Sequence, residues 1–414
     1  MAEQTVKMKT THWYGDDPIE ITFPERWDVH TRLMAGHDLP PLTQEEIRSR
    51  IMSPIGSRRL SEIAEGKETA VIVFSDLTRA DDPQEVLPGI MEELRLAGIK
   101  DDGVTFISGL GGHGTMTRLE WAMKLGEDTV TGHRVFNHNV YDHFEEMGVT
   151  PRGTPVEMNR EYATADVKIG IGGIIAHSFA GFGGGAKGVF PGVASLRSIE
   201  ANHERVDEER ARGRAGYGVM ADNVIRFDME DAARIAGLDF KVDMVYNVDR
   251  RSLGVFAGDF VEEHRAGIDY AKEVLTTEPV READIVVANS YPGEMGKAAW
   301  APKASLREGG TAVIIHNYVQ GSVHHNVYGQ FGKDYGGHLH RYSGRGSVDS
   351  PFPKAGKVII VNRWHSKRDI NPATTWVREW PEALEMLKGE HGAHAKVAVY
   401  PYCALQMPPF PPGY

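Results

Sequence analysis

The stretch TAVIVFSD, residues 69–76, is an apolar, β-branched run that ends in a polar residue. Runs of this length and composition are typical of a strand that is buried on both faces of a parallel sheet. The segment PQEVLPGIMEELRLAGI, residues 83–99, follows it with apolar residues near helical spacing, and Gly98 lies close to its end. This spacing predicts a helix. A strand that is followed at once by a helix indicates an α/β unit.

The same pattern recurs along the chain, with a further strongly helical segment at 195–214. Further strands are predicted at 103–112, 166–174, 240–248, 283–292, 311–317, 357–363 and 396–402. The alternation predicts two α/β domains with largely parallel sheets and an active site between them. We place the domain joint in the helical segment 259–276. This gives an N-terminal domain of residues 1–268 that bears the cofactor and the catalytic residues, and a C-terminal domain of residues 269–414 that completes the substrate site.

Composition limits the classes of function. A formal charge of -12 argues against a general nucleic-acid binder, although local basic clusters can still bind an anionic substrate. The single cysteine excludes an internal disulfide and a multi-cysteine metal site. The sequence has no signal peptide and no apolar run of the about 18 residues that span a membrane, so we expect a cytoplasmic protein.

Polar side chains gather in the loops that follow the predicted strands. In α/β sheets, ligands bind beyond the carboxyl ends of the strands. The residues selected by this rule are Asp76, Arg79, His113, His177, Lys187 and Lys303. Arginine suits a carboxylate or a phosphate, and two histidines at two strand ends suit acid/base chemistry near neutral pH. Taken alone, Arg79 is equally compatible with a structural ion pair, and a lone histidine is more often structural than catalytic.

The loop HSFAGFGGGAKGVFPG, residues 177–192, surrounds one lysine with glycines. It is not a Walker-type phosphate loop, because Gly188 follows Lys187 where a serine or threonine is required. Lys187 could neutralise an anion or form a covalent link, either a Schiff base or another carbonyl-derived bond. His203, on the predicted helix, is on its own compatible with a solvated position. The later histidines match no metal signature and are expected on the surface; they are His316, His324, His325, His338 and His340.

Taken together, these motifs resemble the nickel-dependent lactate racemase family. The resemblance is carried by SDLTR at 75–79, GLGGHGTMTRLE at 109–120, AHSFAGFGGGAKGVFPG at 176–192 and NH at 202–203. It covers about residues 65–210 strongly and the second half only in general style. The motif set is specific as a combination, although each piece alone would be weak.

The resemblance implies a nickel pincer nucleotide joined to Lys187 through a thioamide, with His203 as the one protein ligand to nickel. His113 and His177 would be the acid/base pair, and Arg79 would bind the substrate carboxylate. Further contacts with the cofactor are expected from Asp76, Thr78, Gly184 and Gly185. The implied activity is racemisation or epimerisation of an α-hydroxy acid by hydride transfer to and from the cofactor. Nickel that is held by sulfur and one imidazole agrees with the ligand preferences of that metal.

The sequence departs from the family after SYP, residues 290–292. The family tends to carry a glutamine and a lysine there, three residues apart. In this chain Trp300 would occupy the position of the glutamine and Lys303 that of the lysine, with Lys297 as the alternative lysine. A tryptophan removes a polar contact, so the substrate is expected to be lactate or a larger 2-hydroxy acid.

Two other functions remain open at this point: a Schiff-base enzyme of the pyridoxal type that uses Lys187, and a non-catalytic anion-binding protein. A nucleotide-dependent kinase is disfavoured by the missing hydroxyl after Lys187. The expected partners are a small 2-hydroxy acid and the proteins that make the cofactor, with neither nucleic acid nor membrane. The segment 318–352, rich in Gly, His, Ser and Tyr, is predicted to be a long irregular excursion that serves a site or a contact.

Overall fold

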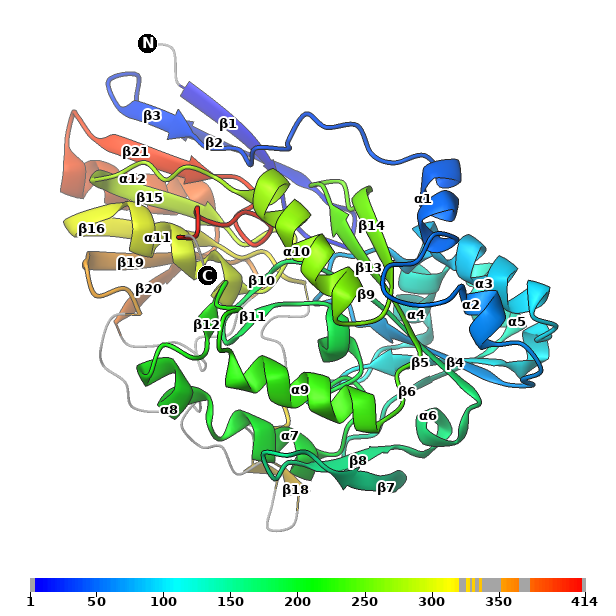
Figure 1. The fold of residues 1–414 in the computed structure, drawn as a ribbon. Coiled ribbons are helices and arrows are strands. Elements are labelled where there is room, and N and C mark those ends of the chain that lie inside the picture. Colours follow the sequence, from blue (N-terminus) through cyan, green and yellow to red (C-terminus); the bar gives the residue numbers. More distant parts are fainter. Residues whose placement is uncertain are drawn as a thin grey trace. The chain divides into compact units, whose positions relative to one another are not determined.

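The computed structural model describes residues 4–319, 325–327, 330–331, 335–336, 351–364 and 373–411. The chain divides into two compact units (Figure 1). Unit 1 comprises the described residues of 4–37, 272–319, 351–364 and 373–410. Unit 2 comprises 38–271 together with 325–327, 330–331, 335–336 and residue 411. The prediction of two α/β domains with largely parallel sheets is confirmed.

Unit 2 is built on a six-stranded sheet in which only the edge strand β14 is antiparallel to its neighbour. In spatial order the strands are β14 (Ser252–Gly258), β13 (Phe240–Tyr246), β9 (Val167–Gly173), β4 (Ala70–Ser75), β5 (Val104–Gly109) and β6 (Arg134–Asn137). Strand β4 is the predicted run at 69–76, and five of its six residues are buried. A central strand that helices cover on both faces needs this continuous apolar composition.

Helices and short strands complete unit 2 (Figure 1). The helices are α1 (Gln44–Ile51), α2 (Leu60–Ile63), α3 (Leu87–Leu96), α4 (Arg118–Leu125), α5 (Glu127–Gly132), α6 (Arg160–Thr164), α7 (Leu196–His203), α8 (Val206–Ala211), α9 (Val224–Ile235) and α10 (Glu262–Leu275), which ends in unit 1. The short strands are β7 (Phe144–Val149), β8 (Pro155–Asn159), β10 (Ala176–His177), β11 (Ala180–Phe182), β12 (Gly216–Tyr217), β17 (Gln330–Phe331) and β18 (Tyr335–Gly336). The helical segment predicted at 195–214 is therefore two helices, and the break leaves His203 in the last turn of α7.

Unit 1 has a second six-stranded sheet, and all of its neighbouring strands are parallel. In spatial order the strands are β20 (Thr374–Val377), β19 (Ala355–Val361), β16 (Leu306–Ile315), β15 (Ala283–Asn289), β21 (Lys396–Tyr400) and β3 (Asp28–Thr31). The other elements are the hairpin of β1 (Gln4–Lys9) and β2 (Pro18–Phe23), and the helices α11 (Trp300–Ser305) and α12 (Trp380–His391). The strands predicted at 283–292, 311–317, 357–363 and 396–402 all lie in this sheet.

The predicted division at residue 268 needs correction at the N-terminus. Residues 4–37 belong to unit 1, because β3 pairs in parallel with β21 and Asp28 lies opposite Lys396. Trp27 is buried in the same core, and its Nε1 donates a hydrogen bond to the Gly392 carbonyl at 3.2 Å. The second crossing between the units falls within α10, inside the predicted joint.

The predicted excursion at 318–352 lies mostly outside the described residues, and so do His324, His338 and His340. Its described part includes Val327, which is buried in the core of unit 2.

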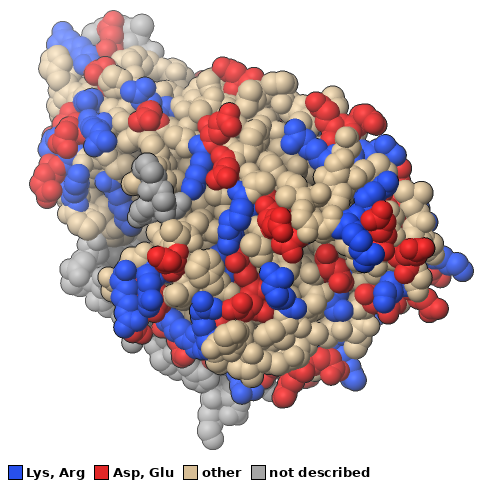
Figure 2. All heavy atoms as spheres, viewed as in Figure 1, with Lys and Arg blue, Asp and Glu red and all other residues tan. Residues whose placement is uncertain are grey.

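The described surface carries mixed charges. Figure 2 shows Lys and Arg interspersed with Asp and Glu over the face in view. Ion pairs on this surface include Arg212 with Glu208, whose side-chain atoms lie 2.6 Å apart. Within the described part of the chain, no helix is both long enough and apolar enough to cross a membrane.

The placement of the N-terminal segment can be tested with Trp27→Ala. We expect the free energy of unfolding to fall by about 3–5 kcal/mol, as for other large-to-small core changes. Hydrogen exchange should show that β15 and β21 lose protection while β4 and β9 keep theirs. Trp364→Ala, at an indole that is 42% exposed in unit 1, is the matched control and should change stability by less than about 1 kcal/mol. Loss of protection in β4 and β9 alone would contradict the assignment.

Candidate functional site

Most of the residues singled out from the sequence lie at one edge of the unit 2 sheet. Strands β9, β4 and β5 are neighbours and run parallel, so their carboxyl ends meet at the same edge. The loop after β4 carries Asp76, Thr78 and Arg79, and the loop after β5 carries His113. The segment after β9 carries His177 and Lys187. The sheet therefore brings three loops to one place, where ligands bind in folds of this kind.

The first group at this edge is a hydrogen-bonded set around Asp76. One carboxylate oxygen of Asp76 lies 2.6 Å from Nδ1 of His113, and the other accepts hydrogen bonds from the backbone amide and the hydroxyl of Thr78. The hydroxyl oxygen of Thr78 in turn accepts a hydrogen bond of 2.7 Å from Arg79. Burial alone would raise the pKa of Asp76, but His113, Arg79 and Thr78 together hold that pKa below its usual range. Asp76 is therefore ionised at neutral pH.

These partners assign opposite tautomers to the two predicted acid/base histidines. Nδ1 of His113 faces the Asp76 carboxylate, so Nδ1 carries the hydrogen and Nε2 is the basic nitrogen. Nδ1 of His177 instead accepts hydrogen bonds from the backbone amides of Phe179, at 3.5 Å, and Ala180, at 3.3 Å. In neutral His177 the hydrogen is therefore on Nε2. The resting site holds one histidine ready to accept a proton at Nε2 and one ready to donate a hydrogen bond there.

The second group surrounds the ring of Phe179. His177 and His203 both contact this ring edge-to-face, with centroid distances of 4.6 and 4.9 Å. Nζ of Lys187 lies over the same ring, 5.9 Å from its centroid. Sequence reasoning missed Phe179, although it lies in the quoted glycine-rich loop two residues after His177. Its ring brings together the lysine and two of the three histidines predicted for the site.

His203 is a buried, neutral imidazole. It is 6% exposed, and burial together with the positive charge of Lys187 lowers its pKa to about 3. The carbonyl of Ile199, one turn earlier in α7, opposes this shift only in part. Nδ1 of His203 makes no hydrogen bond of ordinary geometry. A buried imidazole that stays deprotonated can bind a metal without first losing a proton, so His203 fits the role of a metal ligand.

A metal at His203 would need further ligands from a bound group. Among the residues that the structure describes, no three His, Cys, Asp or Glu side chains are clustered so that they could hold a metal ion. The residues present thus fit a metal that has one protein ligand and takes the rest of its coordination from a cofactor.

The glycine-rich loop is held from behind by Arg226 on α9. This guanidinium is completely buried and donates to the backbone carbonyls of Ala180, Phe182 and Gly184. Burial lowers the pKa of Arg226 to about 10, so it stays charged at neutral pH. Three main-chain acceptors that would otherwise be buried without partners are satisfied by one side chain. The segment between His177 and Lys187 is therefore fixed by the interior of unit 2.

Close packing explains the glycines at 183–185. Nε2 of His264 lies 2.7 Å from the Gly183 carbonyl, and the Gly185 amide donates to Asp243. Gly184 and Gly185 have φ angles of +77° and +56°, which favour glycine. A Cβ at Gly184 would lie 2.6 Å from an oxygen of Asp243, and one at Gly185 would lie 2.8 Å from Cγ of His264. Packing against the protein itself thus requires both glycines. Their predicted contact with a cofactor stays a prediction.

Beneath the loop lies a buried polar cluster of Lys241, Asp243 and Glu263. Lys241 and Asp243 form an ion pair with both side chains completely buried. Glu263 is also completely buried; burial and the neighbouring Asp243 raise its pKa well above the usual range, so it is protonated. The sequence did carry a signal for two members: Lys241 and Asp243 are charged residues two apart in an apolar strand, so they share one face.

The remaining predicted residues lie in unit 1. Trp300 is buried, its Nε1 donates to the Cys403 carbonyl at 3.0 Å, and its ring packs edge-to-face on Tyr400 at 5.1 Å. These contacts give Trp300 a packing role within unit 1. Lys303 is exposed on α11, whereas Lys297 is buried. A substrate contact by Trp300 or Lys303 stays a prediction.

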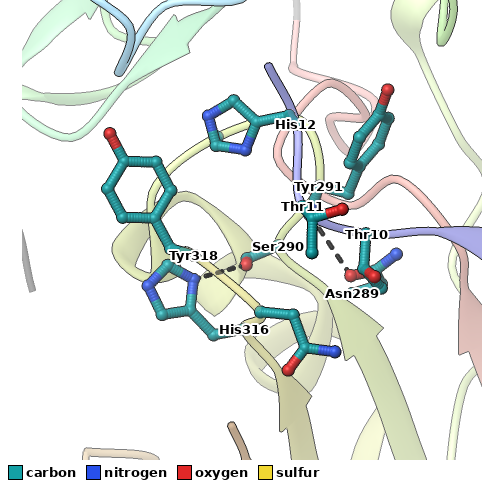
Figure 3. Close-up of a pocket in the computed structure, with 10 residues that line it drawn as sticks. Thr10, Thr11, His12, Asn289, Ser290, Tyr291, His316 and Tyr318 are labelled. Atoms are coloured by element: carbon teal, nitrogen blue, oxygen red, sulfur yellow. Dashed lines mark hydrogen bonds between the residues drawn. The ribbon is translucent and has the colours of Figure 1, made fainter. Parts of the chain in front are cut away.

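Unit 1 also contains a small polar pocket at the carboxyl ends of β15 and β16 (Figure 3). Its volume is about 10 Å³, which is room for one water molecule. Ser290 Oγ and His316 Nδ1 lie 2.7 Å apart, and the ring of Tyr318 stacks between His316 and His12, with centroid distances of 5.9 and 5.0 Å. The expectation of a surface position was wrong for His316, which is 6% exposed.

The fold and the clustered residues define an α/β protein with two histidines predicted to be an acid/base pair, a lysine and a neutral imidazole near one sheet edge. Residues 14–213, which include all of these site residues, match the model of the lactate racemase N-terminal domain. The chain is 35% identical over 283 residues to the lactate racemase of Lactiplantibacillus plantarum, covering 66% of this chain and 65% of that protein. It is 31% identical over 365 residues to the lactate racemase of Thermoanaerobacterium thermosaccharolyticum, covering 84% of each chain.

Two solved structures resemble this one. The lactate racemase apoprotein from Thermoanaerobacterium thermosaccharolyticum superposes with a TM-score of 0.73 at 25% identity, over 98% of this chain and 99% of that chain. A protein from Thermotoga maritima, with a TM-score of 0.63 at 18% identity over 87% and 97% of the two chains, shares the fold. This chain belongs to the lactate racemase family. The predicted family is confirmed, and with it the predicted class of enzyme, since racemases are isomerases.

The buried histidines of unit 2 predict a loss of stability in acid. Burial lowers the pKa of His138 to about 4 and that of His203 to about 3, both from 6.5. Below about pH 6.5 these histidines are protonated in the unfolded chain but stay neutral in the folded chain. The free energy of unfolding therefore decreases as the pH is lowered, until the pH reaches the pKa of the folded state. Each such histidine contributes about 1.4 kcal/mol per pH unit in this window.

We expect His138→Gln to reduce the slope of the free energy of unfolding against pH by about 1.4 kcal/mol per pH unit. Urea unfolding from about pH 7 to about pH 5 measures this slope. His133→Gln is the matched control, because His133 is half-buried in the same unit. An unchanged slope in His138→Gln would show that His138 is protonated in the folded protein.

Proposed function

We propose that this protein is a racemase or epimerase of an α-hydroxy acid, either lactate or a larger 2-hydroxy acid. The observation that carries the proposal is the convergence of His177, His203 and Lys187 on the ring of Phe179, at the same sheet edge as His113. Its relatives in the lactate racemase family support the reaction class. A site of this kind has to act on an unactivated carbon, because the Cα–H of a 2-hydroxy acid is far too weak an acid for an imidazole to remove.

Arg79 binds the substrate carboxylate in this proposal. Its guanidinium is half-buried at the sheet edge and is oriented by its hydrogen bond to the Thr78 hydroxyl. A planar guanidinium can bind a carboxylate with two parallel hydrogen bonds, which fixes both position and orientation. Lys303, or alternatively Lys297, and Trp300 are the other residues proposed to bind the substrate.

His113 accepts the hydroxyl proton of one enantiomer at Nε2. The Asp76 carboxylate, 2.6 Å from Nδ1, stabilises the imidazolium that forms and keeps the ring in the orientation that exposes Nε2 as a base. His177 serves the other enantiomer. Neutral His177 can only donate a hydrogen bond from Nε2, since its Nδ1 accepts from backbone amides, so it gives a proton to the substrate oxygen as an imidazolium. Together the two histidines allow oxidation and reduction at the hydroxyl-bearing carbon from either configuration.

Lys187 is the attachment point for a nickel pincer nucleotide, and His203 is the protein ligand to its nickel. When bound, this cofactor supplies the transfer of a hydride from and to Cα of the substrate. Asp76, Thr78, Gly184 and Gly185 are proposed to contact it. Arg226 and Asp243 hold the loop that carries Lys187, and Lys187 and His203 both contact the ring of Phe179. Loading requires the proteins that make the cofactor.

Replacement of either acid/base histidine tests the proposal. His113→Asn and His177→Asn, each loaded with the cofactor, should lose about 10²–10⁴-fold in the rate of interconversion of L- and D-lactate. His133→Asn is the matched control and should keep the wild-type rate, because it lies outside the site. With lactate deuterated at Cα, chiral chromatography with mass spectrometry should find the label still on carbon after inversion.

Rapid exchange of that label with water would indicate direct proton abstraction and contradict hydride transfer. A visible absorption band that depends on added pyridoxal phosphate would instead favour the Schiff-base alternative at Lys187. Binding of 2-hydroxy acids without interconversion, unchanged in both histidine variants, would favour an anion-binding protein.

A further inference from the structure

A third histidine lies against the proposed base. The ring of His325 contacts that of His113 edge-to-face, with the centroids 5.1 Å apart and the planes at 78°. The backbones of the two residues form an antiparallel bridge, and the amide of Asn326 donates to the Gly112 carbonyl at 2.6 Å. His325 was expected on the surface, within the segment 318–352 that was predicted to serve a site or a contact. It is half-buried, so its ring contacts both His113 and solvent.

The neighbours of His325 fix this contact. Two residues later, Val327 is completely buried in the unit 2 core. A Cβ at Gly112 would lie 2.7 Å from Cε1 of His325 and 3.1 Å from a methyl of Val327. The residue before His113 therefore has to be glycine for the segment to pack here. The ring of His325 is held against that of His113 by three features: the backbone bridge between the two residues, the buried side chain of Val327 and the absence of a side chain at Gly112.

Turnover of the proposed racemase requires a group that accepts a proton from His113 after each conversion. In each net conversion neutral His113 gains the hydroxyl proton of one enantiomer and becomes an imidazolium, and His177, as an imidazolium, gives a proton to the other enantiomer and becomes neutral. After the product leaves, His113 carries one proton too many and His177 one too few. The ionised Asp76 carboxylate lies 2.6 Å from Nδ1 of His113 and forms an ion pair with the imidazolium. The next conversion in the same direction has to wait for this reset.

We propose that His325 is the proton relay that resets His113, an inference that rests on the proposed function. The extra proton leaves Nε2 of His113 for the basic nitrogen of His325, directly or through one water molecule. His113 becomes neutral and His325 becomes an imidazolium. His325 then gives this proton to water or to a buffer base, and His177 regains one from solvent, so protons balance over the cycle. An imidazole suits this transfer because its ordinary pKa lies close to neutral pH.

The test compares cofactor-loaded wild type, His325→Ala and His325→Phe, with L-lactate as the probe. The reset follows product release, so both variants should lower kcat by at least about 10-fold while kcat/KM stays near the wild-type value. Added imidazole, at constant pH and ionic strength, should restore kcat in both variants and leave the wild type unchanged. Metal analysis checks that nickel is retained, and His133→Ala, at another half-buried histidine in an edge-to-face aromatic contact, is the matched control.

The phenylalanine variant separates the relay from packing. If His325 only supported the ring of His113, His325→Phe would keep wild-type kcat, and that result would overturn the relay. A loss of kcat that imidazole does not relieve, or no loss in either variant, would overturn it as well. An active wild type with normal variants refutes the relay alone, whereas an inactive wild type refutes the proposed function and the relay with it.

Discussion

Three backbone carbonyls of the glycine-rich loop converge on one buried guanidinium, that of Arg226. The loop contains the short strands β10 and β11, and it presents His177, Phe179 and Lys187 within eleven residues. Buried carbonyl groups that the strands do not pair each cost about 1–3 kcal/mol if they stay unsatisfied. Arg226 removes this cost for three of them at once. His264 contacts the Gly183 carbonyl and Asp243 accepts a hydrogen bond from the Gly185 amide. Side chains of the protein interior therefore fix the conformation of the loop.

This support has an electrostatic consequence for the site. Lys187 is held near His203, and its positive charge adds to burial in keeping that imidazole neutral. A neutral imidazole can bind a metal without first losing a proton, so the arrangement prepares His203 as a ligand. At the other end of the site, Asp76 is kept ionised and fixes the tautomer of His113. Burial next to a lysine thus keeps His203 neutral, whereas the neighbouring carboxylate of Asp76 fixes the tautomer of His113.

Much of the fold could be predicted because the central strands are apolar runs whose burial needs no other information. The same holds for the site residues in the loops after β4, β5 and β9, since the sheet itself brings those loops together. Strand β3 was missed because its sequence, DVHT, is short and polar and gains its place only by pairing with β21 across the chain. His325 was missed for a similar reason, since it lies far from His113 in sequence and is held by the burial of Val327. Arg226 resembles any helical arginine until the loop that it binds is known.

The central claim is that this loop presents Lys187 for covalent attachment of the cofactor beside His203. Mass spectrometry of the intact protein and of the peptide that contains Lys187, produced together with the cofactor-making proteins, tests it most directly. The account predicts an adduct of roughly a few hundred daltons, the size of a mononucleotide, on Lys187, with nickel in equal amount in wild type and lost in His203→Ala. Lys187→Arg should keep the fold and carry no adduct. An adduct on another residue, or one that persists in Lys187→Arg, would contradict the claim.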